Sequence, residues 1–390
     1  MPNGIILLQA MLNLPPLYPV TDARLDLPLS AQIRRLGQAG FPLVQFRGKP
    51  LDARAQWHEL EKALLEARAN GGWPAICVND RADLAVLAAW KGLAPWGLHL
   101  GQEDLPYRAA RGLPGLGRVH LGASTHRPEQ WLALDPACDH AGVGPLRATA
   151  TKTGHARPLG LDALAAGCRA LRSAGVAPVA IGGLTLEDAR GAFLAGAEAL
   201  AMVGAVARSR APGDLLWQAQ VERWRIRRPF APGQGIVLLG GSGAGKPALA
   251  RHLGRRLGLP DRNPARLVAE RRGEAVPAIL AVRGEAGFRA LEAQAARACL
   301  QAPGVVALGS GAWEDPDTRA AVRAAGFAVL WLAEVPRRAW ALAGPGRPAG
   351  VAYERFLALW AGRSQAWWEG APVLPLGRPP RDLAAALAAG

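Results

Sequence analysis

The sequence predicts an α/β protein with two domains, a (β/α)8 TIM barrel followed by a three-layer α/β domain with a phosphate-binding loop. Eight short apolar runs alternate with helical stretches between residues 17 and 207, as in such barrels. A Pro/Gly-rich segment follows at 227–234, and GGSGAGK comes after the next apolar run. We therefore divide the chain into a barrel (1–226), a linker (227–234) and a second domain (235–390).

Composition places the chain among globular proteins. Of its 390 residues, 50% are hydrophobic and 20% are charged, which is ordinary for a soluble fold. No apolar run reaches the ~20 residues of a membrane span, and the N-terminus lacks the charged start of a secretory signal. The four cysteines are scattered and indicate neither zinc nor disulfides. We therefore expect a cytoplasmic protein without a membrane partner.

The formal charge of +15 raises the question of a nucleic-acid partner. The basic residues are spread along the chain without a Lys/Arg run or a nucleic-acid motif, so we expect none. Only five of the 46 basic residues are lysines, and three of these, Lys49, Lys152 and Lys246, lie in candidate phosphate loops. A positive field also suits substrates that carry several phosphates.

The eight apolar runs are the predicted barrel strands, at residues 17–21, 43–47, 75–79, 97–100, 119–124, 140–144, 178–183 and 199–204. Helices are expected between them, for example at 53–69 and 161–174, where apolar residues recur at helical spacing. Barrel active sites lie at the carboxyl ends of the strands. The polar candidates fall there, in the order Gln45, Arg47, Lys49, Asn79, Asp80, His99, Gln102, Asp104, Ser124, Thr149, Thr151, Lys152, Gly182, Gly183 and Gly204.

The second strand ends in QFRGK, whose side chains alternate between two faces. Gln45, Arg47 and Lys49 therefore point to one side. A guanidinium and an ammonium group on one face are suited to a diphosphate.

Carboxylate and amide oxygens follow the third and fourth strands, from Asn79, Asp80 and Asp104. These are the hard ligands that Mg²⁺ needs when it bridges a diphosphate. Asp and Asn at strand ends also cap turns. Their common position at one barrel end favours a binding site over separate turns.

The segment GVGPLRATATK (142–152) combines a glycine-rich bend with two threonines and a lysine after an apolar run. Free backbone N–H groups, hydroxyls and an ammonium group together suit phosphate oxygens. Gly, Pro and Thr also form ordinary loops, so a plain connection is the alternative.

In these segments the chain resembles the thiamine-phosphate synthase family over residues 17–207. The resemblance implies that a hydroxymethylpyrimidine diphosphate is joined to a thiazole phosphate, with release of pyrophosphate and with Mg²⁺ as cofactor. It further implies a dissociative reaction without a protein nucleophile. The segments that carry it are YPVTDAR, VQFRGK, VNDRADLA, GLHLGQEDLP, LGASTH, GVGPLRATATK, VAIGGLT and AMVGAV.

The same resemblance implies roles for individual residues. Asp80 and Asp104 would hold Mg²⁺, and Arg47, Lys49, Ser124 and Lys152 would be catalytic. The pyrimidine diphosphate would be bound by Gln45, Phe46, Arg47, Gly48, Lys49, Asn79, Ser124 and Lys152. The thiazole phosphate would be bound by Thr149, Ala150, Thr151, Gly183, Val203 and Gly204.

The chain departs from the family pattern at three places. Gly48 lacks the longer side chain common in the QxRxK motif, Gly204 stands where serine is usual, and about five extra residues lie around 91–96. The missing hydroxyl at Gly204 leads us to expect weaker thiazole-phosphate binding. A thiazole tautomerase-like enzyme and a non-catalytic thiamine-phosphate or pyrimidine binding module are the alternatives. The tautomerases lack the QxRxK and TxTK motifs, and a binding module would not require two metal carboxylates.

The second domain begins with a predicted strand at 235–240 and a helix at 248–257, with GGSGAGK between them. This is the context of a nucleotide loop, in which Gly240, Gly243, Gly245 and Lys246 would contact phosphates. The next residue is Pro247, which fits a first helical turn but has no hydroxyl for Mg²⁺. Further strands are expected at 305–308 and 329–332, and a terminal helix at 382–390.

Over about residues 235–372 the chain resembles the shikimate kinase family. The matching segments are GEAGFRALE (284–292), LGSGA (308–312), Arg347 with Pro348, and Arg363. Two acidic residues of the family map by spacing to Asn263 and Ala265, and Ser310 interrupts the glycine triplet. Because a kinase needs groups that hold Mg²⁺, we expect an inactive kinase fold whose loop still binds ATP or another anion. A bifunctional protein with an active small-molecule kinase domain is the alternative.

Overall fold

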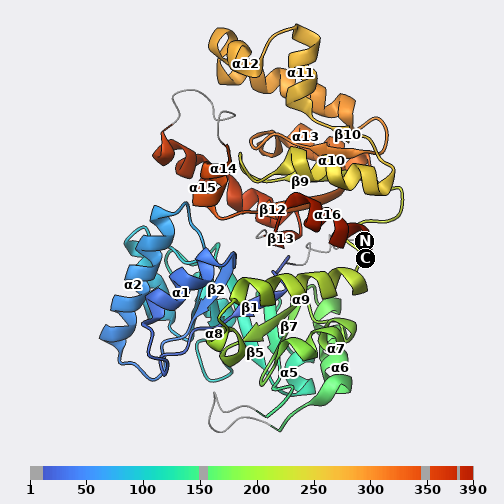
Figure 1. The fold of residues 1–390 in the computed structure, drawn as a ribbon. Coiled ribbons are helices and arrows are strands. Elements are labelled where there is room, and N and C mark those ends of the chain that lie inside the picture. Colours follow the sequence, from blue (N-terminus) through green and yellow to red (C-terminus); the bar gives the residue numbers. More distant parts are fainter. Residues whose placement is uncertain (1–11, 149–156, 344–351, 376–377, 390) are drawn as a thin grey trace, which may run out of the picture. The chain divides into compact units, whose positions relative to one another are not determined.

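The structure, a computed structural model, describes residues 12–148, 157–343, 352–375 and 378–389. These residues form two compact units. The first holds residues 12–68 and 74–219, and the second holds residues 69–73 and those after 219. Each unit is built around its own parallel sheet (Figure 1).

Eight parallel strands form the sheet of the first unit, in the order β1-β8-β7-β6-β5-β4-β3-β2. Past the end of β1, a bridge between Val20 and Gln45 and a 3.0 Å hydrogen bond from Thr21 N to Gln45 O close the ring. The predicted barrel is therefore confirmed, and every predicted strand is present. The bounds are β1 (Leu17–Pro19), β2 (Leu43–Phe46), β3 (Ala75–Asn79), β4 (Gly97–Leu100), β5 (His120–Thr125), β6 (His140–Val143), β7 (Ala177–Ile181) and β8 (Ala199–Met202).

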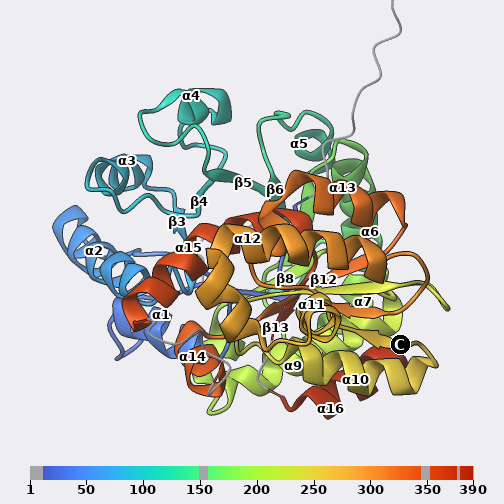
Figure 2. The same cartoon turned by 90° about the horizontal axis from the view of Figure 1, so that it is seen from above.

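Helices follow the strands and cover the outside of the ring (Figure 2). In α2, for example, the buried positions are three or four residues apart, so one apolar face packs inward. The strand β8, with the sequence ALAM, is buried along its whole length, which explains its continuous apolar character. The helices are α1 (Leu29–Gln38), α2 (Ala53–Ala69), α3 (Ala82–Trp90), α4 (Tyr107–Gly112), α5 (Pro128–Leu132), α6 (Gly160–Ser173), η1 (Leu186–Asp188), α7 (Ala189–Leu194), α8 (Gly204–Arg208) and α9 (Pro212–Ile226).

The second unit has five parallel strands in the order β10-β11-β9-β12-β13. They are β9 (Ile236–Leu239), β10 (Asp261–Arg262), β11 (Val305–Ala307), β12 (Ala328–Ala333) and β13 (Val373–Pro375). The helices are α10 (Lys246–Leu257), α11 (Pro264–Arg272), α12 (Val276–Cys299), η2 (Ala312–Glu314), α13 (Pro316–Ala324), α14 (Pro336–Ala343), α15 (Tyr353–Gly370) and α16 (Pro380–Ala389).

Helices lie on both faces of this second sheet. α10 packs with α16 on one face, and α12, α13 and α15 lie on the other (Figure 2), so the predicted three-layer architecture is confirmed. The indoles of Trp331 and Trp367, with ring centroids 6.3 Å apart, are among the largest fully buried side chains. Within α12 the backbone breaks at Gly284, whose φ is +66°, so the GEAGFRALE segment begins a new helical stretch.

The predicted strands at 305–308 and 329–332 are confirmed as β11 and β12. The short strands β10 and β13 were not predicted. Across the described residues, no helix has the length and apolarity needed to cross a membrane. Neither the cytoplasmic location nor the assignment of residues 227–234 as a linker is tested by the structure, and both remain predictions.

Candidate active site

The predicted site residues of the barrel gather at the carboxyl ends of its strands. Arg47 follows β2, Asp80 follows β3, Asp104 lies on the segment after β4, and Ser124 lies near the end of β5. Val203 and Gly204 follow β8, and Gly183 follows β7. Because all eight strands are parallel, these positions share one rim. Thr149, Ala150, Thr151 and Lys152 lie outside the described residues.

The backbone of Arg47 is held by a residue that sequence reasoning missed. Thr21, which follows β1 and is buried, accepts a hydrogen bond from Arg47 N at 2.9 Å and donates to Arg47 O at 3.2 Å. The hydroxyl of a single threonine therefore fixes both polar groups of the Arg47 main chain. A threonine directly after the first strand was the available signal.

The other members of the second strand take different positions. Gln45 is buried, and its Nε2 donates to the Tyr18 hydroxyl at 3.3 Å inside the barrel. Phe46 is only 1% exposed, so its ring belongs to the core and only its main chain is left for a ligand. A Cβ at Gly48 would lie 2.6 Å from Cγ of Gln56. The buried Gln56 side chain thus fills the space that a longer residue at position 48 would take.

Two carboxylates and a lysine meet where β3 and β4 end. Lys49 Nζ lies 2.6 Å from Asp80 Oδ2, although the lysine side chain is 61% exposed. Asp104 Oδ2 accepts a hydrogen bond from Gly101 N at 2.7 Å. The pKa of Asp104 is raised by its burial and by the negative charge of Asp80, against the effect of the Gly101 hydrogen bond. A carboxyl group whose ionisation is opposed by a neighbouring carboxylate lies at a site that favours a cation.

Asp80 has an unusual backbone. Its φ is +63°, the one positive φ outside glycine among the described residues. Its N–H donates to His99 O at 2.8 Å across the rim. Such strain persists where surrounding contacts fix it, often at functional sites.

A hydrogen bond between two further rim residues positions Ser124. Its Oγ lies 3.0 Å from His99 Nε2, and its carbonyl oxygen accepts from Gln102 Nε2. Asn79, the last residue of β3, is paired with His99 in the sheet register. The hydroxyl of Ser124 is therefore held at the rim by His99.

The turn after β7 supports the loop after β6. Gly182 and Gly183 have φ of +98° and +65°, and Arg147 N donates to Gly182 O at 3.0 Å. A Cβ at Gly183 would lie 2.4 Å from Ala148 O. Only glycine fits here, because the two backbones approach each other too closely for a side chain.

The second unit contains the predicted phosphate loop between β9 and α10. Gly240, Gly243 and Gly245 have positive φ, and Pro247 stands in the first turn of α10. Lys246 Nζ donates to Gly240 O at 2.6 Å and to Gly241 O at 2.9 Å. Burial lowers the pKa of this lysine to about 8.

The two positions that lack the expected acids serve structural purposes. Asn263 caps α11, since its side chain accepts a 3.2 Å hydrogen bond from Arg266 N. Ala265 packs against a buried apolar cluster that includes Val268 and Phe288. Neither side chain supplies a carboxylate for a metal or a substrate. Arg347 and Pro348 lie outside the described residues.

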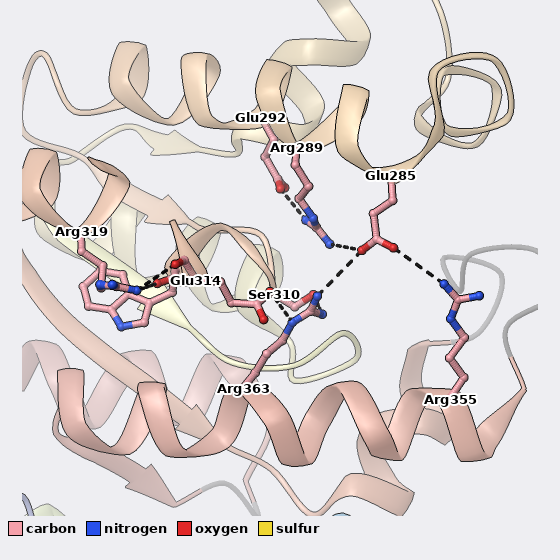
Figure 3. A network of polar contacts seen from close by, with 9 residues as sticks. Glu285, Arg289, Glu292, Ser310, Glu314, Arg319, Arg355 and Arg363 are labelled. Carbon is pink, nitrogen blue, oxygen red and sulfur yellow. Dashed lines mark hydrogen bonds and ion pairs between the residues drawn. The ribbon is translucent and has the colours of Figure 1, made fainter. Parts of the chain in front are cut away.

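Arg289, in the GEAGFRALE segment, and Arg363 both form ion pairs with carboxylates of the chain (Figure 3). Arg289 Nη1 is 2.5 Å from Glu292 Oε2, and Arg363 Nε is 2.9 Å from Glu314 Oε2. Glu285 lies between them, 3.3 Å from Arg289 and 3.9 Å from Arg363. An anionic ligand would have to displace these carboxylates from the guanidinium groups.

Comparison with known proteins supports both resemblances. Residues 17–206 match the family model for thiamine monophosphate synthase, and residues 242–342 match the model for shikimate kinase. The chain is 40% identical over 195 residues to the thiamine-phosphate synthase of Chloroflexus aurantiacus, covering 49% of this chain and 84% of the relative. It is 37% identical over 209 residues to that of Acidothermus cellulolyticus, covering 50% and 92%.

Among solved structures, shikimate kinase from Acinetobacter baumannii in complex with shikimate covers 40% of this chain and 90% of its own, with 23% identity and a TM-score of 0.37. The two family models, not this structure, confirm both family resemblances inferred from the sequence. The relatives of the barrel bear the name of a transferase, as predicted.

Proposed function

Because the chain belongs to the thiamine-phosphate synthase family, we propose that its barrel couples hydroxymethylpyrimidine diphosphate with hydroxyethylthiazole phosphate. The products are thiamine phosphate and pyrophosphate. The observation that carries the proposal is the meeting of Lys49, Asp80 and Asp104 at the rim that also holds Arg47. Cationic donors beside a pair of carboxylates are what the departure of a diphosphate requires.

The residues present fit a Mg²⁺ ion. The negative charge of Asp80 opposes the ionisation of Asp104, and a divalent cation held by the two carboxylates would relieve that repulsion. Within the described residues no group of three or more His, Cys, Asp or Glu is placed to hold a metal. The remaining ligands would therefore be water and diphosphate oxygens, as is usual for Mg²⁺. Bound there, Mg²⁺ would neutralise charge on the diphosphate.

The chain's own groups then have distinct tasks. The guanidinium of Arg47, whose main chain is fixed by Thr21, would stabilise the negative charge that develops on the leaving diphosphate. Lys49 is exposed enough to turn from Asp80 toward a phosphate. Ser124, held by His99, would orient the pyrimidine side of the substrate. Positioning and charge stabilisation suffice for a dissociative bond cleavage, so no protein nucleophile is required.

The test is direct formation of thiamine phosphate by the purified full chain, with and without Mg²⁺. Asp104→Asn removes one metal carboxylate, and Glu103→Gln, an exposed neighbour, is the matched control. We expect Mg²⁺-dependent product from the wild type and from Glu103→Gln, and almost none from Asp104→Asn. No product from the wild type at saturating substrates would favour the binding-module alternative.

For the second unit we propose an anion-binding loop without shikimate kinase activity. The backbone amides from Gly240 to Lys246 need no metal to hold a phosphate. Pro247, Asn263 and Ala265 supply neither a hydroxyl nor a carboxylate for Mg²⁺ or for substrate hydroxyls. The measurement is ATP or sulfate binding by calorimetry, together with ADP release in the presence of shikimate.

A further inference from the structure

The guanidinium of Arg208 lies over Gly204 at the start of α8. Residues four apart in a helix are neighbours, and side chains lean toward the helix N-terminus. A Cβ at Gly204 would lie 2.8 Å from Nη2 and 3.0 Å from Nη1 of Arg208. The guanidinium therefore occupies the space in which a side chain at position 204 would begin. Any residue larger than glycine would have to push it aside.

The backbone that carries Arg208 is anchored to the barrel. Arg35 of α1 donates from Nη1 to Ala207 O at 3.1 Å and from Nη2 to Ser209 O. Between these contacts and β8, Val206 is only 1% exposed. The backbone at the base of the Arg208 side chain is thus fixed, while the residue itself is exposed.

The charge of Arg208 is not compensated within the described chain, where no carboxylate forms an ion pair with it. On the neighbouring strand, Ile181 is paired in register with Ala201. The Gly182–Gly183 turn and Gly204 therefore follow the ends of two adjacent strands, β7 and β8. An unpaired guanidinium with several N–H donors at this point of the rim suits a phosphate group.

Resting on the proposed function, we propose that Arg208 binds the phosphate of the thiazole substrate. It would take over the contact that a serine hydroxyl at position 204 would otherwise make. The glycine at position 204 then does not weaken binding. It leaves the space that the Arg208 guanidinium needs to reach the phosphate. This proposal replaces the expectation of weaker thiazole-phosphate binding drawn from Gly204 alone.

The test compares Arg208→Ala with Arg210→Ala, a neighbouring exposed arginine, in the full chain. We expect Arg208→Ala to raise KM for the thiazole phosphate about tenfold, the usual size of one charge-assisted hydrogen bond. The kcat and the KM for the pyrimidine diphosphate should change less than about twofold. Arg210→Ala should match the wild type. Equal KM values for the thiazole phosphate in the two variants would overturn the proposal.

A second variant tests the exchange between the two side chains. Gly204→Ser supplies the hydroxyl, and in the Arg208→Ala background it should recover most of the lost affinity. Added to the wild type, the same substitution should not increase the affinity for the thiazole phosphate, because the serine and the guanidinium compete for one place. An increase in affinity in both backgrounds, or in neither, would contradict the exchange.

Calorimetric binding of the thiazole phosphate separates this inference from the proposed reaction, since it needs no turnover. If no variant forms product but Arg208→Ala alone loses binding, the coupling reaction is wrong and the phosphate contact stands. If product forms and Arg208→Ala binds as tightly as Arg210→Ala, the reaction stands and the contact is wrong.

Discussion

Gly122 of β5 separates two buried imidazoles, and its replacement by alanine should disturb the barrel interior. The added Cβ would lie 2.3 Å from Nε2 of His140 and 2.5 Å from Nδ1 of His99. The rings are 0% and 6% exposed, so neither has open space to enter. His99 also holds the Ser124 hydroxyl at 3.0 Å. A shift of His99 would therefore reach the candidate active site.

The size of the effect follows from overpacking. Forcing a methyl group into a closed core costs about 1–3 kcal/mol, which lowers the Tm of a unit of this size by roughly 2–4 °C per kcal/mol. Burial, and then the charge of His99, lower the pKa of His140 to about 3. The His140 ring is thus neutral above about pH 4, so its own titration should not change the penalty between pH 6 and pH 8.

The assay is thermal unfolding of the full chain with turnover measured on the same preparation. Gly142→Ala on β6 is the matched control, because its Cβ would lie 3.5 Å from Ile181 Cγ2 and 3.7 Å from Ala123 O, both ordinary contacts. We expect Gly122→Ala to lower both Tm and kcat/KM. Gly142→Ala should change the free energy of unfolding by less than about 0.5 kcal/mol. Equal Tm values for the two variants would refute the crowding argument.

Three further predictions concern the rim and the second unit. Arg47→Ala should lower turnover about 100-fold or more, the cost of one charge-stabilising donor, with an unchanged Tm in thermal unfolding. The raised pKa of Asp104 means that its ionisation opposes folding as pH rises above 3.8, so Asp104→Asn should raise the metal-free Tm at pH 7 but not below pH 3.8. This gain should be less than about 1 kcal/mol because the group is partly screened, and added Mg²⁺ should stabilise only the wild type. The wild type should release no shikimate-dependent ADP, and a gain by the Pro247→Ser/Ala265→Asp double variant would support the roles assigned to these positions.

The sequence predicted the barrel and the rim because a parallel barrel couples local pattern to position. Once eight strands are identified, their carboxyl ends must meet, so Arg47 and Asp80 can be placed at one rim without coordinates. The contacts across the interior follow a different rule. That Gly122 lies between His99 and His140 depends on the register of three strands, which no local pattern reveals.

In the second unit, motif spacing identified Asn263 and Ala265 as altered positions but did not predict what these residues do in the fold. The side chain of Asn263 serves as a helix cap only because α11 begins directly after it. The ion pair between Arg363 and Glu314 joins positions 49 residues apart. Such a pair depends on how α15 packs near η2, and a charge pattern along the chain cannot distinguish it from two solvated side chains.

Asp80 combines an unfavourable backbone conformation with a carboxylate that the rim uses. A left-handed backbone at a non-glycine position costs of the order of 1 kcal/mol or more, and a glycine would remove that cost. It would also remove the carboxylate that Lys49 contacts at 2.6 Å and that raises the pKa of Asp104. The 2.8 Å bond from Asp80 N to His99 O fixes the strained backbone. Because His99 also positions Ser124, one histidine connects the backbone of Asp80 to the hydroxyl of Ser124. The strained backbone of Asp80 and the crowded space at Gly122 thus both adjoin His99.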